Sequence, residues 1–291
     1  MTDHTQHRHD LGYSEVTFSG ALPAPAELAE RVRRRGWWYF AEYVLSAMRA
    51  WLLSALVGAV GNPLVYLLAL GLGLGAIVGE RTGTVDGVSY LVFVAPGLLI
   101  STLVMSVIGE LGYPILGGFS WNRTFYAAHA TPLRPWQIAL GHAVAVEIRF
   151  VAQSAIFYAL MLAFGASPSP WGWLTIGIGA LTAAAFGALI MAFSASRESA
   201  GDGSFVLIQR FVVMPMFLFA GTFFPLEAMP GYLHWIGWVS PIWHGTQLSR
   251  LASYGSAVPG WLVAGHLCFL AVMTAVGMWL AIRIFTRRLT S

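Results

Sequence analysis

The chain has 291 residues, of which 57% are hydrophobic and only 10% charged, with a mean hydropathy of +0.68. A soluble domain carries about a quarter charged residues, so this chain cannot cover a globule of its size with polar surface. Charges are missing altogether between Arg49 and Glu80, between Arg149 and Arg197, and between Arg250 and Arg283. A helix that spans a bilayer needs about 20 apolar residues, so the composition excludes a soluble globular protein and predicts an all-α membrane protein.

Residues 1–36 are predicted to form a flexible cytoplasmic tail, because they are polar and contain scattered Pro and Gly. They show no cleavable secretory signal. His4, His7 and His9 are suitable metal ligands, but a solvated tail is the simpler interpretation.

An amphipathic helix is predicted over 37–50. Trp37, Phe40 and Val44 recur at helical spacing, and Glu42 lies on the opposite side. Arginines before it and aromatic residues at its start are typical of a helix at the membrane interface. The alternative is that these residues form the first turns of the next span.

Six membrane spans follow in chain order. The prolines at 63, 96 and 215 each remove an intrahelical hydrogen bond, so we expect kinks or breaks there. The apolar stretch 225–254 is interrupted by three prolines and predicts short re-entrant helices before the last span. The predicted spans are 52–76, 88–109, 137–165, 171–195, 204–225 and 258–283, followed by a cytoplasmic tail at 286–291.

The stretch "LLALGLGLGAIVGER" over 67–81 contains the pattern G-x-G-x-x-A of a dinucleotide fingerprint. That fingerprint needs a preceding strand in a soluble βαβ unit and an acidic residue about 20 positions later. Here the glycines lie in a long uncharged run, so they indicate close helix packing or a loosened helix end.

The arginines determine the predicted orientation. They supply all 16 basic residues, and with both termini in the cytoplasm the outer segments hold only Arg81 and Arg250. The positive-inside rule favours this arrangement in a plasma or inner membrane. The net charge of +3 reflects this bias and gives no indication of nucleic-acid binding. The predicted inner segments hold Arg31, Arg33, Arg34, Arg35, Arg123, Arg134, Arg197, Arg283, Arg287 and Arg288.

Residues for catalysis are scarce. Cys268 lies in the last predicted span, where a small core hydrophobe is the default interpretation. The histidines from 129 to 266 are scattered, without the close pairing of a helical metal site. A P-loop needs a lysine, and this chain has none. We therefore expect no enzyme activity, metal or cofactor on this chain, and any ATP and Mg²⁺ would bind a partner subunit.

Four blocks resemble the permease subunit of ABC-2-type exporters, in the branch of the nodulation-factor and daunorubicin-resistance exporters. They are "NPLVYLLALGLGLG", "YLVFVAPGLL", "RTFYAAHATPLRPWQIALGH" and "FLFAGTFFPLEAMPGYLHWIGWVSPIWHGTQLSRLASYG", and the resemblance covers about 37–285. Ala220 replaces an expected Ser, and Trp243 replaces a smaller residue.

The resemblance implies a mechanism. Two permease subunits, identical or homologous, would each bind a cytoplasmic ABC ATPase subunit, with lipid around them. The helix at 37–50 would be the connecting helix, 120–131 the coupling helix and 225–254 the outer gate. The alternative is a secondary transporter or channel without an ATPase partner, which a neighbouring ATPase reading frame would argue against.

The coupling helix is expected to begin at Ser120 as N-cap and to end before Pro132. Its i, i+4 spacing aligns three rings in one stripe that we expect to enter a cleft on the ATPase. The alternative is that the aromatic residues anchor the loop in lipid. The candidate residues are Trp121, Phe125 and His129 in the stripe, with Arg123 and Tyr126 at the rim.

An intramembrane charge network is expected around Glu147 and Arg149, which lie about half a helix deep in their span. A charge at that depth costs several kcal/mol unless it is paired. The two residues point to nearly opposite faces, so each needs another partner. The candidates for Arg149 are Glu110 and Glu42, and the pair either transmits motion or only fixes helix packing.

A substrate path is predicted beside the prolines, lined by Phe93, Met214, Phe217 and Phe219. Such a wall suits an amphipathic drug, a lipid or a lipid-linked glycan that leaves the cytoplasm or the inner leaflet. Lipid-facing helices have the same composition, so that alternative stays open.

Overall fold

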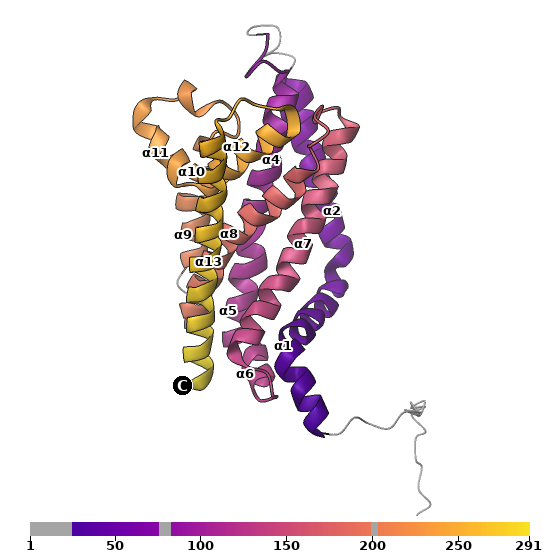
Figure 1. Cartoon of the computed structure of the whole chain (residues 1–291), viewed down its shortest axis with the longest axis vertical. Helices are drawn as coiled ribbons and strands as arrows, with labels where there is room; N and C mark the ends of the chain where they lie inside the picture. Colours follow the sequence, from indigo (N-terminus) through magenta and orange to yellow (C-terminus); the bar gives the residue numbers. More distant parts are fainter. Residues whose placement is uncertain (1–24, 76–82, 199–202) are drawn as a thin grey trace, which may run out of the picture.

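The computed structural model describes residues 25–75, 83–198 and 203–291, and these residues form helices joined by turns (Figure 1). Five helical segments are long and apolar enough to cross a membrane. They confirm the predicted all-α membrane class, and each of them overlaps one of the six predicted spans. The five are Leu53–Leu70, Tyr90–Ser120, Pro135–Ala163, Leu174–Ser196 and Gly260–Thr290.

The fifth predicted span, 204–225, is shorter in the structure. Helix α9 (Ser204–Ile208), the π-helical turn η4 (Gln209–Val213) and α10 (Met214–Phe219) form one apolar segment that ends at residue 219. At 1.5 Å per residue it reaches about 24 Å, less than the ~30 Å hydrocarbon core. The chain turns at Gly221, whose φ of +79° suits glycine, and this turn ends the helix early.

Helix α1 (Pro25–Met48) begins twelve residues before the predicted boundary at 37, within the segment assigned to a flexible tail. Arg31 pairs with Glu27 and Arg34 with Glu30, each one helical turn apart. Farther along, Phe40 and Ala41 are buried while Glu42 is exposed. Local charge pairs therefore support the first half of α1, and packing against the bundle supports the second.

Helix α1 crosses α7 (Pro135–Ala163) at close range. A Cβ atom on Gly141 of α7 would collide with the backbone oxygen of Trp37. The side chain of Gln137 donates hydrogen bonds to the carbonyls of Val32 and Arg33, at 3.0 and 3.1 Å. These contacts fix α1 against the lower end of the bundle (Figure 1).

Helix α4 (Tyr90–Val107) lies at the centre of the bundle, next to α8 (Leu174–Ser196), α7 and α12 (Pro241–Tyr254). In the most apolar 18 residues of the segment Tyr90–Ser120, 78% of the residues are buried, against 11% in Leu53–Leu70. The first span, formed by α2 (Leu52–Tyr66) and η2 (Leu67–Leu74), therefore lies at the periphery. Helix α13 (Gly260–Thr290) packs along α8 and completes the bundle.

The described helices contain π-helical turns at three places, and two of these turns lie next to prolines where a kink or break was predicted. Pro63 precedes the π-helical η2, and Pro215 follows the π-helical η4. The third π-helical turn, η3 (Ile108–Gly112), contains Glu110 and no proline. Helix α4 continues through Pro96, so no break occurs there. Such π turns are frequently found at functional sites.

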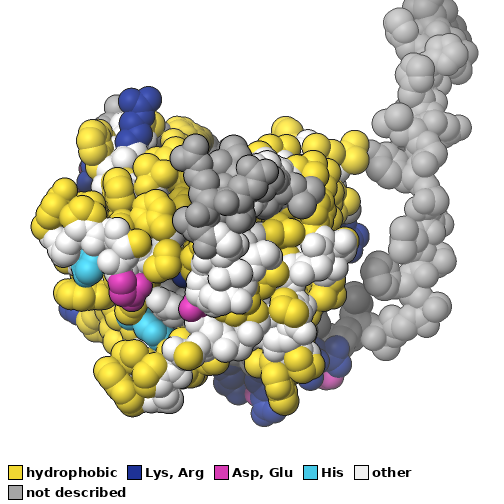
Figure 2. Space-filling model, turned by 90° about the horizontal axis from the view of Figure 1, so that it is seen from above, with side chains coloured by type: hydrophobic (Ala, Val, Ile, Leu, Met, Phe, Trp, Pro, Cys, Tyr) yellow, Lys and Arg dark blue, Asp and Glu magenta, His cyan; other side chains and the backbone are white. Residues whose placement is uncertain are grey.

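The stretch 225–254 forms short helices, as predicted: η5 (Leu226–Ala228), η6 (Gly231–Leu233), α11 (His234–Val239) and α12. Ser240 caps α12 by accepting a hydrogen bond from Ile242 N, and Gly255 ends it with a φ of +78°. The upper end of the molecule carries mainly hydrophobic side chains around a small group of acidic and histidine side chains (Figure 2).

Candidate functional site

The predicted charge pair is present. The guanidinium of Arg149 in α7 donates to the carboxylate of Glu110 in η3 across 2.5 Å, with both side chains partly buried. Among the described residues, the prediction that Arg149 pairs with a carboxylate is confirmed, and its partner is Glu110 rather than Glu42. Glu42 is exposed on α1 and takes no part in this pair.

Glu147 lies outside the pair. It borders a separate cavity of about 170 Å³ between α7, α8 and α13, whose wall is otherwise formed by apolar side chains and one Thr. Of the four residues in the predicted network, Arg149 and Glu110 therefore form an ion pair, and Glu42 and Glu147 lie apart from it.

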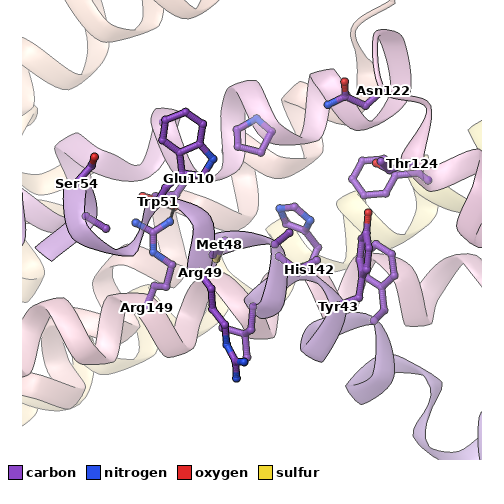
Figure 3. Close-up of a pocket in the computed structure, with 18 residues that line it drawn as sticks. Tyr43, Met48, Arg49, Trp51, Ser54, Glu110, Asn122, Thr124, His142 and Arg149 are labelled. Atoms are coloured by element: carbon purple, nitrogen blue, oxygen red, sulfur yellow. Dashed lines mark hydrogen bonds and ion pairs between the residues drawn. The ribbon is translucent and has the colours of Figure 1, made fainter. Parts of the chain in front are cut away.

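The Arg149–Glu110 pair lies in the wall of a larger cavity of about 760 Å³ (Figure 3). The cavity lies between α1, the start of α2, η3, α6 (Thr124–His129) and α7. One part of its wall is apolar and another is polar. The apolar part includes Phe40, Val44, Leu45, Met48, Trp51, Ala55 and Pro114, and the polar part includes Tyr43, Arg49, Ser54, Glu110, Asn122, Thr124, His142 and Arg149.

His142 is one of the polar residues of this wall that sequence reasoning missed as site residues. Its side chain is 6% exposed, and the backbone of Glu110 lies beside the ring. Neither ring nitrogen has a hydrogen-bond partner within the described chain. A buried polar group without a partner is costly. The sequence signal that could have identified His142 was its spacing from Arg149. Seven residues are two helical turns, so the two side chains lie on the same face of α7.

The predicted coupling helix differs in register and in its buried face. Ser120 is the last residue of α5 (Tyr113–Ser120) rather than an N-cap, and α6 begins at Thr124, after Arg123 with a left-handed φ of +51°. Phe125 does not protrude as its predicted entry into a cleft on the ATPase requires, because its ring is 2% exposed. Its ring packs against those of Phe40, Phe119, Phe285 and His142.

The large exposed side chains of this loop are those of Trp121, Arg123 and Tyr126. The side chain of Trp121 is 60% exposed and that of Tyr126 is 39% exposed. His129 is half-buried, with Nδ1 in the interior. The loop therefore presents one indole, one guanidinium and one phenol at the end of the molecule that carries the C-terminus (Figure 1).

Arg250 is a second residue whose role sequence reasoning missed. It is 3% exposed, its guanidinium lies 3.7 Å from the centroid of the Phe93 ring, and it donates to three backbone carbonyls. The acceptors are Phe93 at 3.3 Å, Gly221 at 2.8 Å and Thr222 at 3.3 Å. Arg250 thereby ties α12, α4 and the turn after α10 together. The sequence signal that could have identified Arg250 was the absence of an acidic residue within two helical turns of it, because its guanidinium then needs partners from other elements.

The predicted substrate-path residues do not form one surface in this chain. Phe93 is 1% exposed beneath Arg250, and Phe217 is 8% exposed and packs against Phe223 and Tyr66. Met214 is 41% exposed, and Phe219 is half-buried. Cys268 is exposed on α13 rather than in the core, contrary to the default interpretation.

Two of the histidines that are scattered in the sequence meet in space. The Nδ1 atoms of His244 and His266 are 2.7 Å apart, and His244 Nε2 lies 3.0 Å from the carbonyl of Trp238. The carbonyl can only accept, so Nε2 of His244 carries its proton, and a neutral His244 then accepts from His266. Among the described residues no three His, Cys, Asp or Glu side chains form a metal-binding group.

Comparison with known proteins gives the family. Residues 34–254 match the family model described as ABC-2 type transporter. The chain is 29% identical over 250 residues to Nodulation protein J of Sinorhizobium fredii, covering 83% of this chain and 90% of that protein. It is 31% identical over 241 residues to Nodulation protein J of Neorhizobium galegae, covering 81% and 87%.

A shorter match is to the probable multidrug ABC transporter permease YbhR of Escherichia coli. It is 29% identical over 171 residues, which cover 55% of this chain and 43% of that protein. The matched family region contains the charge pair, the larger cavity, α6 and Arg250. Together with its apolar helices, these matches show that the chain belongs to the ABC-2 type transporter family and is a membrane-embedded permease subunit of an ABC transporter.

Proposed function

We propose that this chain is the permease subunit of an ATP-driven exporter that moves an amphipathic drug, lipid or lipid-linked glycan out of the cytoplasm or the inner leaflet. The family implies association with an ABC ATPase subunit, which would bind ATP and Mg²⁺ and carry out the hydrolysis. The observation that carries the proposal is the family match over most of a helical bundle with an exposed loop at one end.

The proposed orientation places both termini and the arginine-rich end in the cytoplasm. Support comes from the arginines of α1, of the loop before α7 and of the end of α13, which lie toward one end of the molecule (Figure 1). In this arrangement the segment Ser204–Phe219 and the following turn provide a sixth crossing. The 37–48 part of α1 would then lie at the membrane interface as the connecting helix.

Cysteine labelling tests this orientation. In a Cys268→Ala background, we expect a membrane-impermeant thiol reagent on intact cells to label Thr84→Cys but not Thr131→Cys. Both positions are exposed, and they lie in turns at opposite ends of the bundle. After permeabilisation both should react, which controls for accessibility. Labelling of Thr131→Cys on intact cells would contradict the proposed topology.

The ATPase is proposed to bind the loop at 121–131 through its exposed side chains. Trp121, Arg123 and Tyr126 protrude, and an ATPase in the cytoplasm acts on parts of the permease that protrude from the membrane. Below them, Phe125 packs against α1 and α13 through Phe40 and Phe285. A force on the exposed residues would therefore reach the spans through this ring cluster.

Trp121→Ala tests the docking surface. A buried indole anchor is worth about 2 kcal/mol or more of binding, so we expect at least a tenfold weaker association with the ATPase and loss of permease-stimulated hydrolysis. The permease itself should keep its thermal unfolding midpoint, because Trp121 is 60% exposed. The measurements are co-purification of the two subunits, ATP hydrolysis and ATP-driven export from cells.

The matched control is Trp171→Ala, an equally exposed indole (62%) in the turn at the opposite end of α7. It should leave association unchanged. If Trp121→Ala and Tyr126→Ala both retain normal association and coupled hydrolysis, the ATPase binds elsewhere. A lipid-anchoring role for the loop would also leave association unchanged.

A second permease subunit, identical or homologous, is proposed to pack against this one in the membrane. Support comes from the first span, of which 11% is buried and whose Leu53, Val57 and Val65 are exposed. Lipid would cover the remaining apolar faces.

A further inference from the structure

We propose that a cavity at the upper end of the bundle binds a primary ammonium group, with Glu227 and His266 as its principal contacts. The cavity has a volume of about 340 Å³ and lies between α4, α12, the start of α13 and the turns that contain Asp86 and Glu227. It is at the opposite end of the molecule from α6, in the loop proposed to bind the ATPase (Figure 1). An amine site here requires neither the proposed ATPase contact nor a particular direction of transport.

His266 places a hydrogen-bond acceptor inside the cavity. It is 3% exposed and borders the cavity, and its Nδ1 is bonded to Nδ1 of His244. Because His244 donates from Nε2 to the carbonyl of Trp238, the proton between the two Nδ1 atoms belongs to His266, and Nε2 of a neutral His266 carries a lone pair.

The Nε2 atom of His266 is free to receive a ligand. It has no hydrogen-bond partner among the described residues, and it is not one of the polar atoms that the fold closes off from solvent. Since the rest of this residue is buried, the cavity is the route by which a donor reaches Nε2.

The charged side chains of the wall leave one negative charge. Asp86, Glu227 and Arg250 are the charged residues of the lining. Arg250 donates from Nε and Nη2 to three backbone carbonyls. Asp86 accepts from the hydroxyls of Tyr254 and Ser256 at 2.7 and 3.0 Å, which fixes its carboxylate at the rim. Glu227 is exposed and forms no ion pair within the part of the chain that the structure describes. One guanidinium balances one of two carboxylates, so the lining attracts a cation.

The acceptors of the wall favour an ammonium group over a metal ion. Within the described ranges no three His, Cys, Asp or Glu side chains form a metal-binding group. A primary ammonium group has three N–H donors and bonds its acceptors over about 2.8 Å, a longer reach than that of a metal ion. The carboxylate of Glu227, Nε2 of His266 and the amide oxygen of Gln247 are three acceptors in one lining. Trp243 adds an indole, and aromatic rings also stabilise cations.

The apolar part of the wall indicates what carries the amine. Pro225, Val258 and Leu262 belong to the same lining as the acceptors. The volume of about 340 Å³ is near the lower end of the ~300–1,000 Å³ that is usual for ligand pockets. The cavity therefore suits a primary amine with a small apolar group, such as one aromatic ring.

Equilibrium dialysis of radiolabelled phenethylamine against the purified permease–ATPase complex, without ATP and at pH 8, tests the proposal. At this pH free imidazole is neutral and an alkylamine is protonated. We expect saturable binding, with 2-phenylethanol, 3-phenylpropionate and N,N,N-trimethylphenethylammonium competing at least tenfold more weakly. The alcohol lacks the charge, the carboxylate has the opposite charge, and the trimethylated compound lacks N–H donors. Equal or stronger competition by 3-phenylpropionate would show that Arg250 sets the preference of the cavity, and would overturn the proposal.

Substitutions in the wall test the two principal contacts. Glu227→Gln and His266→Asn should each weaken the binding of phenethylamine about tenfold, the effect of losing one hydrogen bond to a charged group. Asparagine keeps a donor near the position of Nδ1 and removes Nε2. Gln247→Glu adds a carboxylate to the same wall and should strengthen binding about threefold.

A matched control separates binding from folding and from overall charge. Glu42→Gln removes an exposed carboxylate from α1, outside the cavity, and should bind phenethylamine within twofold of the unchanged protein. Glu227→Gln should keep the thermal unfolding midpoint of the unchanged protein, because Glu227 is exposed. Its weaker binding then reports the lost contact.

Two further arms identify the source of the amine. If the site receives cargo, the complex in vesicles moves phenethylamine across the membrane when ATP is added, and Glu227→Gln moves less. If the site holds the amine of a membrane lipid, phenethylamine binds more weakly in phosphatidylethanolamine bilayers than in phosphatidylcholine bilayers, and ATP moves none. Both results support an amine site. Equal binding of phenethylamine by Glu227→Gln, His266→Asn and the unchanged protein overturns it, whether or not ATP-driven transport is found.

Discussion

Replacing Arg149 by Leu should lower the stability of the folded permease by about 3 kcal/mol, because it leaves the Glu110 carboxylate unpaired inside the bundle. We expect a lower yield and a lower thermal unfolding midpoint in detergent. Glu110→Leu should have a similar cost for the opposite reason, since it leaves the guanidinium unpaired. The double variant Glu110→Leu/Arg149→Leu should lose at least 1 kcal/mol less than the sum of the single variants.

The matched control is Glu42→Leu, which removes a carboxylate from the exposed side of α1. Its effect should stay within about 0.5 kcal/mol. If the loss of stability in the double variant equals the sum of the losses in the two single variants, Arg149 and Glu110 are not coupled.

The double variant also separates the two interpretations of the pair. Glu110 lies in the π-helical turn η3, between α4 and α5, and therefore joins the central span to the loop of the proposed coupling surface. If the pair transmits motion, the double variant folds and binds the ATPase but hydrolyses ATP without export. If the pair only fixes packing, the folded double variant exports normally.

Replacing Arg250 by Met should be the most destabilising single substitution at the upper end of the bundle. It removes the donors to the carbonyls of Gly221 and Thr222 and the cation stacked on Phe93. Buried carbonyls left without donors, together with the lost stacking, correspond to about 3 kcal/mol or more. The expected results are a lower unfolding midpoint and faster protease cleavage in the turn 220–225. Arg250→Lys should recover only part of the loss, because an ammonium lacks the planar fork of donors.

Arg283→Met is the matched control, because Arg283 also stacks on a ring, that of Trp279, at 5.4 Å, but on an exposed face of α13. It should shift the midpoint little. Equal midpoints and equal cleavage for Arg250→Met and Arg283→Met would contradict the assignment of Arg250 as the link between α12, α4 and the turn.

The sequence by itself determined the class of the protein and the places of five long apolar helices. Inside a bilayer the backbone has no water to bond, so an uncharged run of about 20 residues is stable there as a helix. The same cost of an unpaired charge in lipid predicted that Arg149 needs a carboxylate partner. The family resemblance also lay in contiguous blocks, which the comparisons confirm over residues 34–254.

The tertiary structure alone decided which residues meet and which face the interior. Glu110 and Glu42 were equally acceptable partners for Arg149, and only the packing of η3 against α7 selected Glu110. The i, i+4 spacing that includes Phe125 is compatible with a buried face of the helix and equally with an exposed one. The ring of Phe125 is buried because α6 packs against Phe40 and Phe285. Helical periodicity orients a side chain only relative to its own helix axis. The choice of partner for Arg149, the burial of Phe125, the carbonyls around Arg250 and the partnerless His142 depend on how the helices are placed against one another.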